Sequence, residues 1–199
     1  MAEELNTLEN GFRHVSNSKR DIRTAADFEG LKLRVIQNPL YIDTFKALGV
    51  NATPMPFPEV FGALETKTVD GQENPAATIL ASKFYEVQKH ITLSNHGHLA
   101  YAVIANKPFW DGLPADIRTT LAGAMKDATT YANAIAATEN AQSLEKIKAS
   151  GKSTVYTLTA AEQTEWKKAL MPVHKEMESR VGKATIDAAY KAAGFVAPK

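Results

Sequence analysis

Apolar residues alternate with polar ones, or recur at helical spacing, in a regular succession through the first half of the chain. Leu31, Leu33 and Val35 occupy every second position of one run, which is typical of a half-buried strand. The predicted elements are a helical turn over 25–29, a strand over 31–35, a helix over 41–48, a strand over 52–55 and a helix from Pro58. Because helices separate the strands, we expect right-handed crossovers, a mostly parallel sheet and a ligand site beyond the carboxyl ends of the strands.

The second half is predicted to add two strands and then to become mainly helical. The expected elements are a helix over 76–84, strands over 90–95 and 99–106, a long helix over 115–149, a strand over 155–158, a helix from 160 and a last helix over 183–193. Ile117 and Leu121 begin an apolar stripe that predicts the buried face of the long helix. Pro172 is expected to kink or divide the next helix. The predicted organisation is an α/β ligand-binding lobe over 1–110, on which the long helix and the C-terminal helices of 111–199 pack.

Composition and charge narrow the classes of function. With 199 residues and 44% hydrophobic content, the chain can bury a core in one domain or in two small lobes. Lysine and arginine total 23 against 22 acidic residues, and a formal charge of +1 predicts no attraction for nucleic acid. The absence of cysteine excludes disulfides, thiolate metal sites and a cysteine nucleophile. The opening residues MAEELNTLEN contain no apolar run, so we expect neither a signal peptide nor a lipid anchor within them.

Two arginines are the first candidate ligand-binding residues. The segment NGFRHVSNSKRDI places Arg13 among several cations, and we expect it to form a polar loop. Arg34 lies inside a strand whose other members are mostly apolar. A guanidinium keeps its charge and offers a planar fork of donors, so an arginine at the end of a parallel strand suits a carboxylate held by two hydrogen bonds. The alternative is that Arg34 lies on the polar side of an alternating strand and faces solvent.

The segment VDGQENP, residues 69–75, is the second candidate. We expect an Asp-Gly turn that ends a strand and presents amide side chains such as Asn74 at its carboxyl edge, where neutral donors could complete the hydrogen bonds of a ligand. An ordinary turn whose side chains bond their own backbone explains the same residues. Phe57, which stands between two prolines, could form an apolar wall of the same pocket or belong to the core.

Histidines and catalytic motifs do not favour an enzyme or a metalloprotein. His96 and His98 are two positions apart and could share one face of a strand, but a third metal ligand is not evident. His14, His90 and His174 are scattered and are predicted to be surface residues. The sequence contains no G-x-S-x-G, G-x-x-x-x-G-K or G-x-G-x-x-G motif. We therefore expect no enzyme activity, no metal and no cofactor.

Five separated blocks of sequence carry a resemblance to a known family. In chain order they are NGFRHVSNSKRDI, GLKLRV, ALGVNATPMPFPEVFGALETKTVDGQENP, FYEVQKHITLSNHG and FWDGLPADIR. From Asn10 to the C-terminal helices, the chain resembles the dicarboxylate-binding, DctP-type family of solute-binding proteins that serve tripartite ATP-independent periplasmic (TRAP) transporters. The resemblance implies an α/β fold like that of periplasmic binding proteins, a periplasmic location, a small organic acid as ligand and a membrane permease as partner.

The resemblance also implies ligand-binding roles for five residues. Arg34 is implied to form the salt bridge to the ligand carboxylate, and Arg13 to support it. Asn74 is implied to face the ligand, and Phe57 to line the cleft. Gln37 occupies a position from which several members of the family contact their substrate.

One departure from the family is expected to matter. Its members carry a segment of an N-terminal lobe ahead of the NGFR block, and this chain is expected to lack about the first third of the protein, which truncates the first lobe. A second copy of the chain could then cover exposed sheet edges in a homodimer. Two other interpretations stay open: a remnant that no longer binds solute and acts as a self-associating helical scaffold, and an enzyme that uses Glu73 or His96 as a base.

Overall fold

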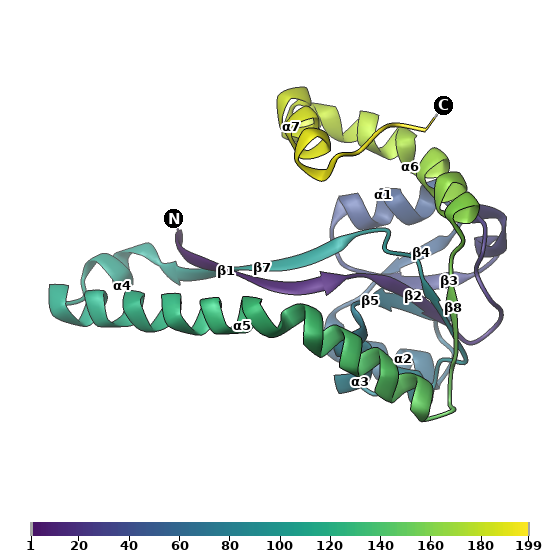
Figure 1. Ribbon diagram of the computed structural model, residues 1–199, viewed down its shortest axis with the longest axis horizontal. Coiled ribbons are helices and arrows are strands. Elements are labelled where there is room, and N and C mark those ends of the chain that lie inside the picture. The colour runs from purple at the N-terminus through teal and green to yellow at the C-terminus, as the bar shows by residue number, and fades with distance from the viewer. Residues whose placement is uncertain (1, 199) are drawn as a thin grey trace.

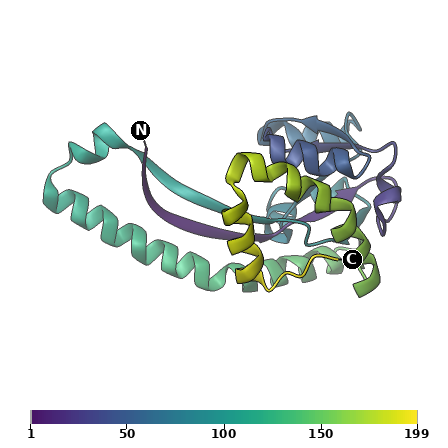
Figure 2. The same ribbon diagram turned by 90° about the horizontal axis from the view of Figure 1, so that it is seen from above.

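The computed structural model describes residues 2–198, which form a mixed α/β body with a long arm projecting from one side (Figure 1). The body holds a six-stranded sheet between helices. The arm consists of a two-stranded sheet and the first part of one long helix. The two C-terminal helices run along one side of the body and reach out over the start of the arm (Figures 1 and 2).

The sheet of the body contains six short strands in the order β4-β3-β5-β2-β6-β8. Their bounds are β2 His14–Asn17, β3 Lys32–Val35, β4 Asn51–Pro54, β5 Gly71–Asn74, β6 His90–Leu93 and β8 Thr154–Thr157. β3 is parallel to β4 and β5, β6 is parallel to β8, and β2 is antiparallel to both β5 and β6. The predicted α/β class with a parallel or mixed sheet is therefore confirmed.

Hydrophobic clusters pack on both faces of this sheet, because successive side chains of a strand point to opposite sides. One cluster includes Leu33 of β3 and Phe45, both fully buried. The other includes Ile91 of β6 and Ile79. Burial of one such side chain contributes about 1.5–3 kcal/mol relative to its exposure, so the two clusters fix the positions of the strand ends.

Five helices cover the faces of the sheet or extend from them. They are α1 Pro39–Ala47, α2 Val60–Glu65, α3 Ala76–Ala81, α6 Ala160–Val181 and α7 Lys183–Ala193, with 3₁₀ turns at Ala25–Phe28, Phe57–Glu59 and Phe84–Glu86. α3 ends at Ala81 and not at residue 84 as predicted, because Lys83 adopts a left-handed conformation with φ of 56°. α6 runs through Pro172 without division and changes direction along its length (Figure 1).

The arm begins with β1 (Ala2–Phe12), which pairs antiparallel with β7 (His98–Asn106). The polar loop predicted for the segment that holds Arg13 and the cations after it is wrong at Arg13, where β1 and β2 meet. It is confirmed for residues 18–24, which are neither helix nor strand and contain Lys19, Arg20 and Arg23. Two register shifts in β1 interrupt the two-residue period by which a strand is recognised in a sequence. The pattern of polar and apolar residues therefore does not reveal this strand.

α4 (Lys107–Asp111) and α5 (Ala115–Ala149) complete the arm, and α5 runs from its tip back into the body (Figure 1). The predicted buried stripe of α5 is wrong in its first part, where Ile117 and Leu121 are 44% and 43% exposed. The buried residues of α5 are Thr129, Ser143 and Ile147. Among residues 2–198, no helix combines the length and the apolar character that crossing a bilayer demands.

Candidate ligand-binding site

The strand directions bring the predicted ligand-binding residues to one edge of the sheet. Arg34 lies near the carboxyl end of β3, and Asn74 ends β5. β4 runs parallel to them and leads into the turn that begins at Phe57. β2 runs the other way and pairs His14 with Asn74, so Arg13, the residue before β2, reaches the same edge. Ligands of open α/β sheets normally bind at such an edge.

An open cavity of about 560 Å³ lies at this edge of the sheet. All five predicted ligand-binding residues line it, together with apolar side chains and two hydroxyl groups. The lining consists of Arg13, Arg34, Ile36, Gln37, Met55, Pro56, Phe57, Asn74, Thr78, Leu99 and Tyr101. None of these residues is acidic, and two carry a positive charge. A small anion with an apolar or hydroxylated body suits such a cavity.

Arg34 is a buried cation without an anionic partner. It is 3% exposed, so the alternative that it faces solvent is wrong. Its Nε and Nη2 donate to the carbonyl oxygen of Met55 at 3.0 and 2.8 Å, and its Cζ lies 5.9 Å from the ring centre of Phe57. No carboxylate within residues 2–198 forms a salt bridge with it. Burial lowers the pKa of its guanidinium, but an arginine stays charged at neutral pH.

Arg13 is fully buried, but its charge is paired with Glu73. Nε and Nη2 donate to the two carboxylate oxygens of Glu73, and Nη2 also donates to the Glu73 carbonyl oxygen at 2.7 Å. Nη1 is buried and has no hydrogen-bond partner in the described part of the chain. A buried charged group that lacks one hydrogen bond costs about 1–3 kcal/mol, so the structure pays a penalty at Nη1.

Glu73 and His96 hold Arg13 from outside the cavity lining. His96 Nε2 lies 3.2 Å from Glu73 Oε2, and its Nδ1 lies 2.7 Å from the hydroxyl oxygen of Ser94. Burial opposes ionisation of Glu73, but the hydrogen bonds from His96 and Arg13 and the charge of Arg13 outweigh it and lower the pKa of this carboxyl. Sequence reasoning missed this arrangement, because no periodic pattern relates residues that are 60 and 23 positions apart.

Asn74, Phe57 and Gln37 complete the predicted set. Asn74 is buried and its Nδ2 donates to Gln72 Oε1 at 2.6 Å. It belongs to β5, so the alternative of an ordinary turn is wrong. Phe57 is 45% exposed and packs edge-on against Phe84 at 5.9 Å, so it lies at the cavity and not in the core. Gln37 is exposed and follows the end of β3.

Among the lining residues that were not foreseen, Tyr101 and Thr78 carry hydroxyl groups. Tyr101 comes from β7 in the arm, and Thr78 comes from α3 in the body. Both hydroxyl oxygens accept from Asn10 Nδ2, at 2.6 and 3.4 Å. They line the cavity because the arm crosses the edge of the sheet, and no local pattern in the sequence predicts this crossing.

The histidines of the described residues do not gather into a metal site. His96 bonds to Glu73, whereas His98 Nε2 pairs with Glu9 at 2.9 Å. No group of three His, Cys, Asp or Glu side chains that could hold a metal ion occurs within residues 2–198. His14, His90 and His174 are predicted to be surface residues, but all three are half-buried, and the Nδ1 of His14 is enclosed. Burial, reinforced by the nearby His96, lowers the pKa of His14 to about 4.

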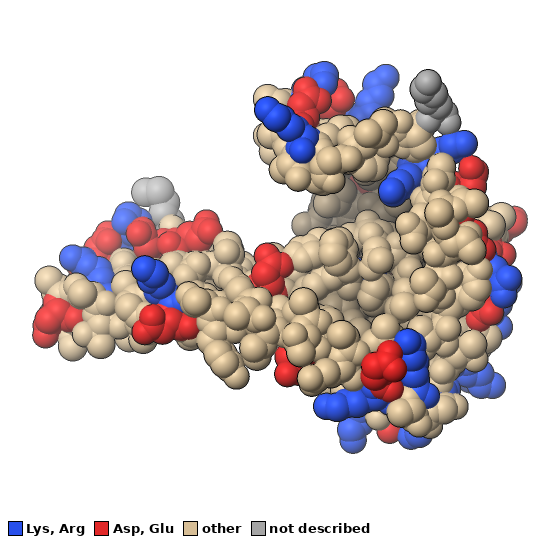
Figure 3. Space-filling model, viewed as in Figure 1, with Lys and Arg blue, Asp and Glu red and all other residues tan. Residues whose placement is uncertain are grey.

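Basic and acidic side chains are interspersed on the surface in view in Figure 3. Lys152, for example, pairs with Glu86 at 2.9 Å, and Lys107 pairs with Glu3 at 3.1 Å. The hollow beneath the C-terminal helices is lined mainly by uncharged residues (Figure 3). This face therefore carries no continuous basic patch of the kind that attracts a polyanion.

The family match and the most similar curated proteins point to the same family of solute-binding proteins. Residues 2–180 match bacterial extracellular solute-binding protein, family 7 (DctP). Over 185 residues the chain is 47% identical to the C4-dicarboxylate-binding periplasmic protein of Rhodobacter capsulatus, which covers 93% of this chain and 55% of that protein. Over 143 residues it is 38% identical to the 2,3-diketo-L-gulonate-binding periplasmic protein of Escherichia coli, with coverage of 72% and 44%. The chain thus spans about half the length of these curated relatives.

Solved structures agree with the sequence comparison. A TRAP periplasmic solute-binding protein of Shewanella oneidensis with bound succinate has a TM-score of 0.94 at 37% identity, covering 96% of this chain and 62% of that one. The sugar acid binding protein of Advenella mimigardefordensis in complex with galactonate has a TM-score of 0.92 at 39% identity, with coverage of 97% and 62%. The predicted likeness to the fold of periplasmic binding proteins is confirmed.

Proposed function

Because this chain belongs to family 7 of the bacterial extracellular solute-binding proteins, we propose that it binds a small organic acid reversibly for delivery to a TRAP permease. The chain covers about half of each curated relative, so the activity, the ligand and the partner of the whole protein are all part of this proposal. The relatives with bound succinate and galactonate support a carboxylate as the ligand class.

One observation carries the proposal: Arg34 is a buried charge that forms no salt bridge with a carboxylate of the described residues. Desolvating a charge costs several kcal/mol, roughly, unless an opposite charge compensates for it. Arg13 already has such a partner in Glu73, whereas Arg34 donates only to a neutral carbonyl oxygen. The open cavity beside Arg34 gives a ligand carboxylate direct access to the uncompensated guanidinium.

The other predicted residues fit complementary roles. Arg13 Nη1 would donate a second charged hydrogen bond to the ligand, and the amides of Asn74 and Gln37 would bond its polar groups. Phe57 would shield the ion pair from water, which strengthens its attraction. These five residues are our proposed ligand-binding set, with Arg34 as the principal carboxylate partner.

The same geometry favours binding over catalysis. Glu73, the candidate base, uses both carboxylate oxygens on Arg13 and His96, and its lowered pKa makes it a weak proton acceptor. Glu73 and His96 are also outside the cavity lining. We therefore propose that the protein is not an enzyme, and that Glu73 and His96 orient Arg13.

Location and assembly extend the proposal. The named relatives are periplasmic proteins, which supports a periplasmic location for this protein. Within residues 2–198 the two-stranded sheet of the arm pairs with no further strand. Side chains of α5 bond the backbone of β1, which leaves the outer edge of β7 unpaired, and such edges favour pairing with another chain. We propose that a second copy of this chain covers the arm at high concentration, which light scattering over a concentration series would test: a constant monomer mass would contradict it.

Titration calorimetry of this chain with succinate, L-malate and galactonate tests the binding function. We expect one of these acids to bind the unmodified chain, and Arg34→Lys to weaken it by about 10- to 100-fold, because the two-bond fork is lost while the charge remains. Lys32→Ala, which removes an exposed cation from the same strand, is the matched control and should bind as the parent does.

Each alternative has its own outcome in this experiment. A folded chain that binds none of the three acids would favour the self-associating scaffold over a solute-binding protein. Binding that Arg34→Lys leaves unchanged would contradict the role given to Arg34. Consumption of a bound acid would favour the enzyme.

A further inference from the structure

Side chains on one face of α5 bond to the backbone and side chains of β1. Thr129 Oγ1 accepts from Asn6 Nδ2 at 2.5 Å, and Asn133 Oδ1 accepts from the backbone nitrogen of Glu9 at 2.8 Å. Asn140 is seven residues further along, which returns it to the same face of the helix. α5 therefore follows β1 from the arm to the edge of the ligand cavity.

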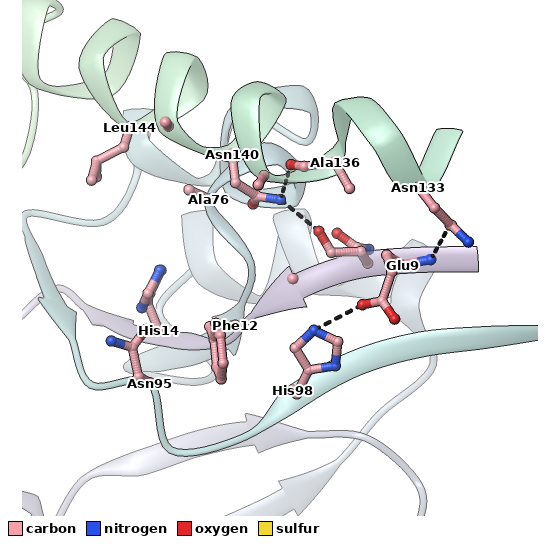
Figure 4. Close-up of a pocket in the computed structure, with 14 residues that line it drawn as sticks. Glu9, Phe12, His14, Ala76, Asn95, His98, Asn133, Ala136, Asn140 and Leu144 are labelled. Carbon is pink, nitrogen blue, oxygen red and sulfur yellow. Dashed lines mark hydrogen bonds and ion pairs between the residues drawn. The ribbon is translucent and has the colours of Figure 1, made fainter. Parts of the chain in front are cut away.

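Asn140 makes the most extensive of these contacts (Figure 4). Its Nδ2 donates to the carbonyl oxygens of Asn10 and Ala136 at 2.5 and 3.0 Å, and its Oδ1 accepts from the backbone nitrogen of Ala77 at 3.1 Å. One amide thus joins three elements, α5, β1 and α3. The contact is close-fitting, because a Cβ on Gly11 would lie 2.7 Å from Asn140 Nδ2.

Asn10 is the extra residue at a β-bulge. β1 pairs Glu9 with Ala100 and Gly11 with Leu99, so Asn10 has no opposite residue in β7. A bulge frees the backbone of the extra residue and changes the direction of its side chain. Here the freed carbonyl oxygen of Asn10 accepts from Asn140 on the α5 side.

The side chain of Asn10 reaches the ligand cavity. Its Nδ2 donates to the hydroxyl oxygens of Tyr101 and Thr78, and both of these residues line the cavity. Because each hydroxyl oxygen accepts from Asn10, its own proton remains available to an oxygen atom of a ligand. The backbone and side chain of one bulged residue thereby connect Asn140 to two donors in the cavity wall.

We propose that Asn140, acting through Asn10, is a positioning residue that sets the Tyr101 and Thr78 hydroxyls for ligand binding. The inference rests on the proposed function. It adds that the ligand carries, besides the carboxylate at Arg34, a second oxygen that accepts a hydrogen bond from Tyr101. Asn140 touches no ligand and acts through the position of β1 relative to α3.

A double-mutant cycle tests this role, with succinate, L-malate and galactonate as the probes. We expect Asn140→Asp to weaken binding by about tenfold, since it keeps the acceptor for Ala77 but loses the donor to Asn10. Tyr101→Phe should weaken binding to a similar extent. The double variant should be no weaker than the weaker single variant, because both changes remove the same contact with the ligand.

A matched control separates positioning from general support of the arm. Asn133 lies on the same face of α5 and also bonds β1, to the backbone of Glu9 and Thr7, but it does not line the ligand cavity. Asn133→Asp should therefore lower the unfolding midpoint as Asn140→Asp does, while its affinity stays within about twofold of the parent. Equal losses of affinity in the two variants would overturn the proposal, as would losses that multiply in the double variant.

A readout that needs no ligand distinguishes failure of this inference from failure of the binding function. In protein with ¹³C-labelled tyrosine, the Tyr101 signal should shift in Asn140→Asp, while that of exposed Tyr131 on α5 stays unchanged. An unmoved Tyr101 signal overturns the inference even where the acids bind. A shifted signal in a chain that binds none of the acids overturns the proposed function and, with it, the role in ligand binding.

Discussion

The body and the arm are held together by different interactions. In the body, the apolar clusters on the six-stranded sheet contain side chains with almost no exposure, such as Leu33 and Ile91. In the arm, β1 and β7 form a sheet of two strands, and large apolar residues such as Ile104 and Phe109 are 63% and 62% exposed. A two-stranded sheet is marginally stable by itself, so the arm depends on α5 for its shape.

α5 belongs to both regions, and it packs through apolar contacts in the body and through hydrogen bonds in the arm. In the body it ends with Ile147, which is fully buried in an apolar cluster. In the arm it bonds β1 through Thr129, Asn133 and Asn140. Each such hydrogen bond contributes about 0.5–1.5 kcal/mol, less than the burial of one large apolar side chain. The body therefore supplies most of the stability, and the arm supplies directional contacts that place Tyr101 at the cavity.

The largest effect is expected from the buried charges of the body. Glu73→Ala leaves the buried Arg13 without its anion, and loss of one partner of a buried pair costs about 3–5 kcal/mol. Urea unfolding at neutral pH measures this loss. Glu86→Ala, which breaks the exposed pair with Lys152, is the control and should cost far less. Similar losses in the two variants would contradict the idea that burial of the Arg13 charge, and not the ion pair as such, makes Glu73 important for stability.

An intermediate effect is expected from the buried imidazole of His14. Its pKa falls from 6.5 to about 4 on folding, so the unfolded chain binds more protons between these values and stability decreases as the pH falls through them. Between about pH 7 and pH 5 the loss amounts to roughly 2 kcal/mol. The contribution of ionised Glu73 is lost only below its ordinary value of 4.5, outside this window. Burial also lowers the pKa of His174, so the variants below are needed to assign the slope to His14.

Urea unfolding across this pH window measures the His14 contribution. His14→Gln should remove most of the slope, because glutamine does not titrate. His98→Gln, a change at an exposed histidine of the arm, should leave the slope in place. A parent protein whose stability is constant from about pH 7 to pH 5 would contradict a buried neutral His14.

The same difference between regions explains what could be predicted from the sequence. Periodic patterns identify the body, where burial decides which residues are apolar: the strand of Leu33 and the helix of Phe45 were predicted close to their observed bounds. The arm has polar side chains at buried positions such as Thr129 and bulges in β1, so neither a helical stripe nor strand alternation marks its inner face.

The candidate site divides in a similar way. Arg34 and Asn74 stand out because a charged or amide side chain at the end of a strand is unusual, and Arg13 and Phe57 are candidates from their local sequence. The resemblance to a family added Gln37 and gave Arg13 and Phe57 their expected roles. The support for this set was not predicted. Contacts of the lining with residues such as Asn10 and Glu73 join segments that are distant in sequence, and only the fold brings them together.

The smallest effect is expected from the exposed apolar surface of the arm. Ile104→Thr keeps a β-branched residue in β7 and removes little buried area, so the free energy of unfolding should change by less than about 0.5 kcal/mol in dilute solution. Leu33→Thr in the body is the matched change and should cost several times more, because that side chain is fully buried.

Unfolding measured at two protein concentrations tests whether a second copy of the chain packs on the arm. If a second copy covers the arm, the unfolding midpoint of the parent rises with concentration and that of Ile104→Thr does not. A loss of 2 kcal/mol or more, roughly, for Ile104→Thr at the lower concentration would mean that the arm is held by apolar burial after all, and the contrast between the two regions would be wrong.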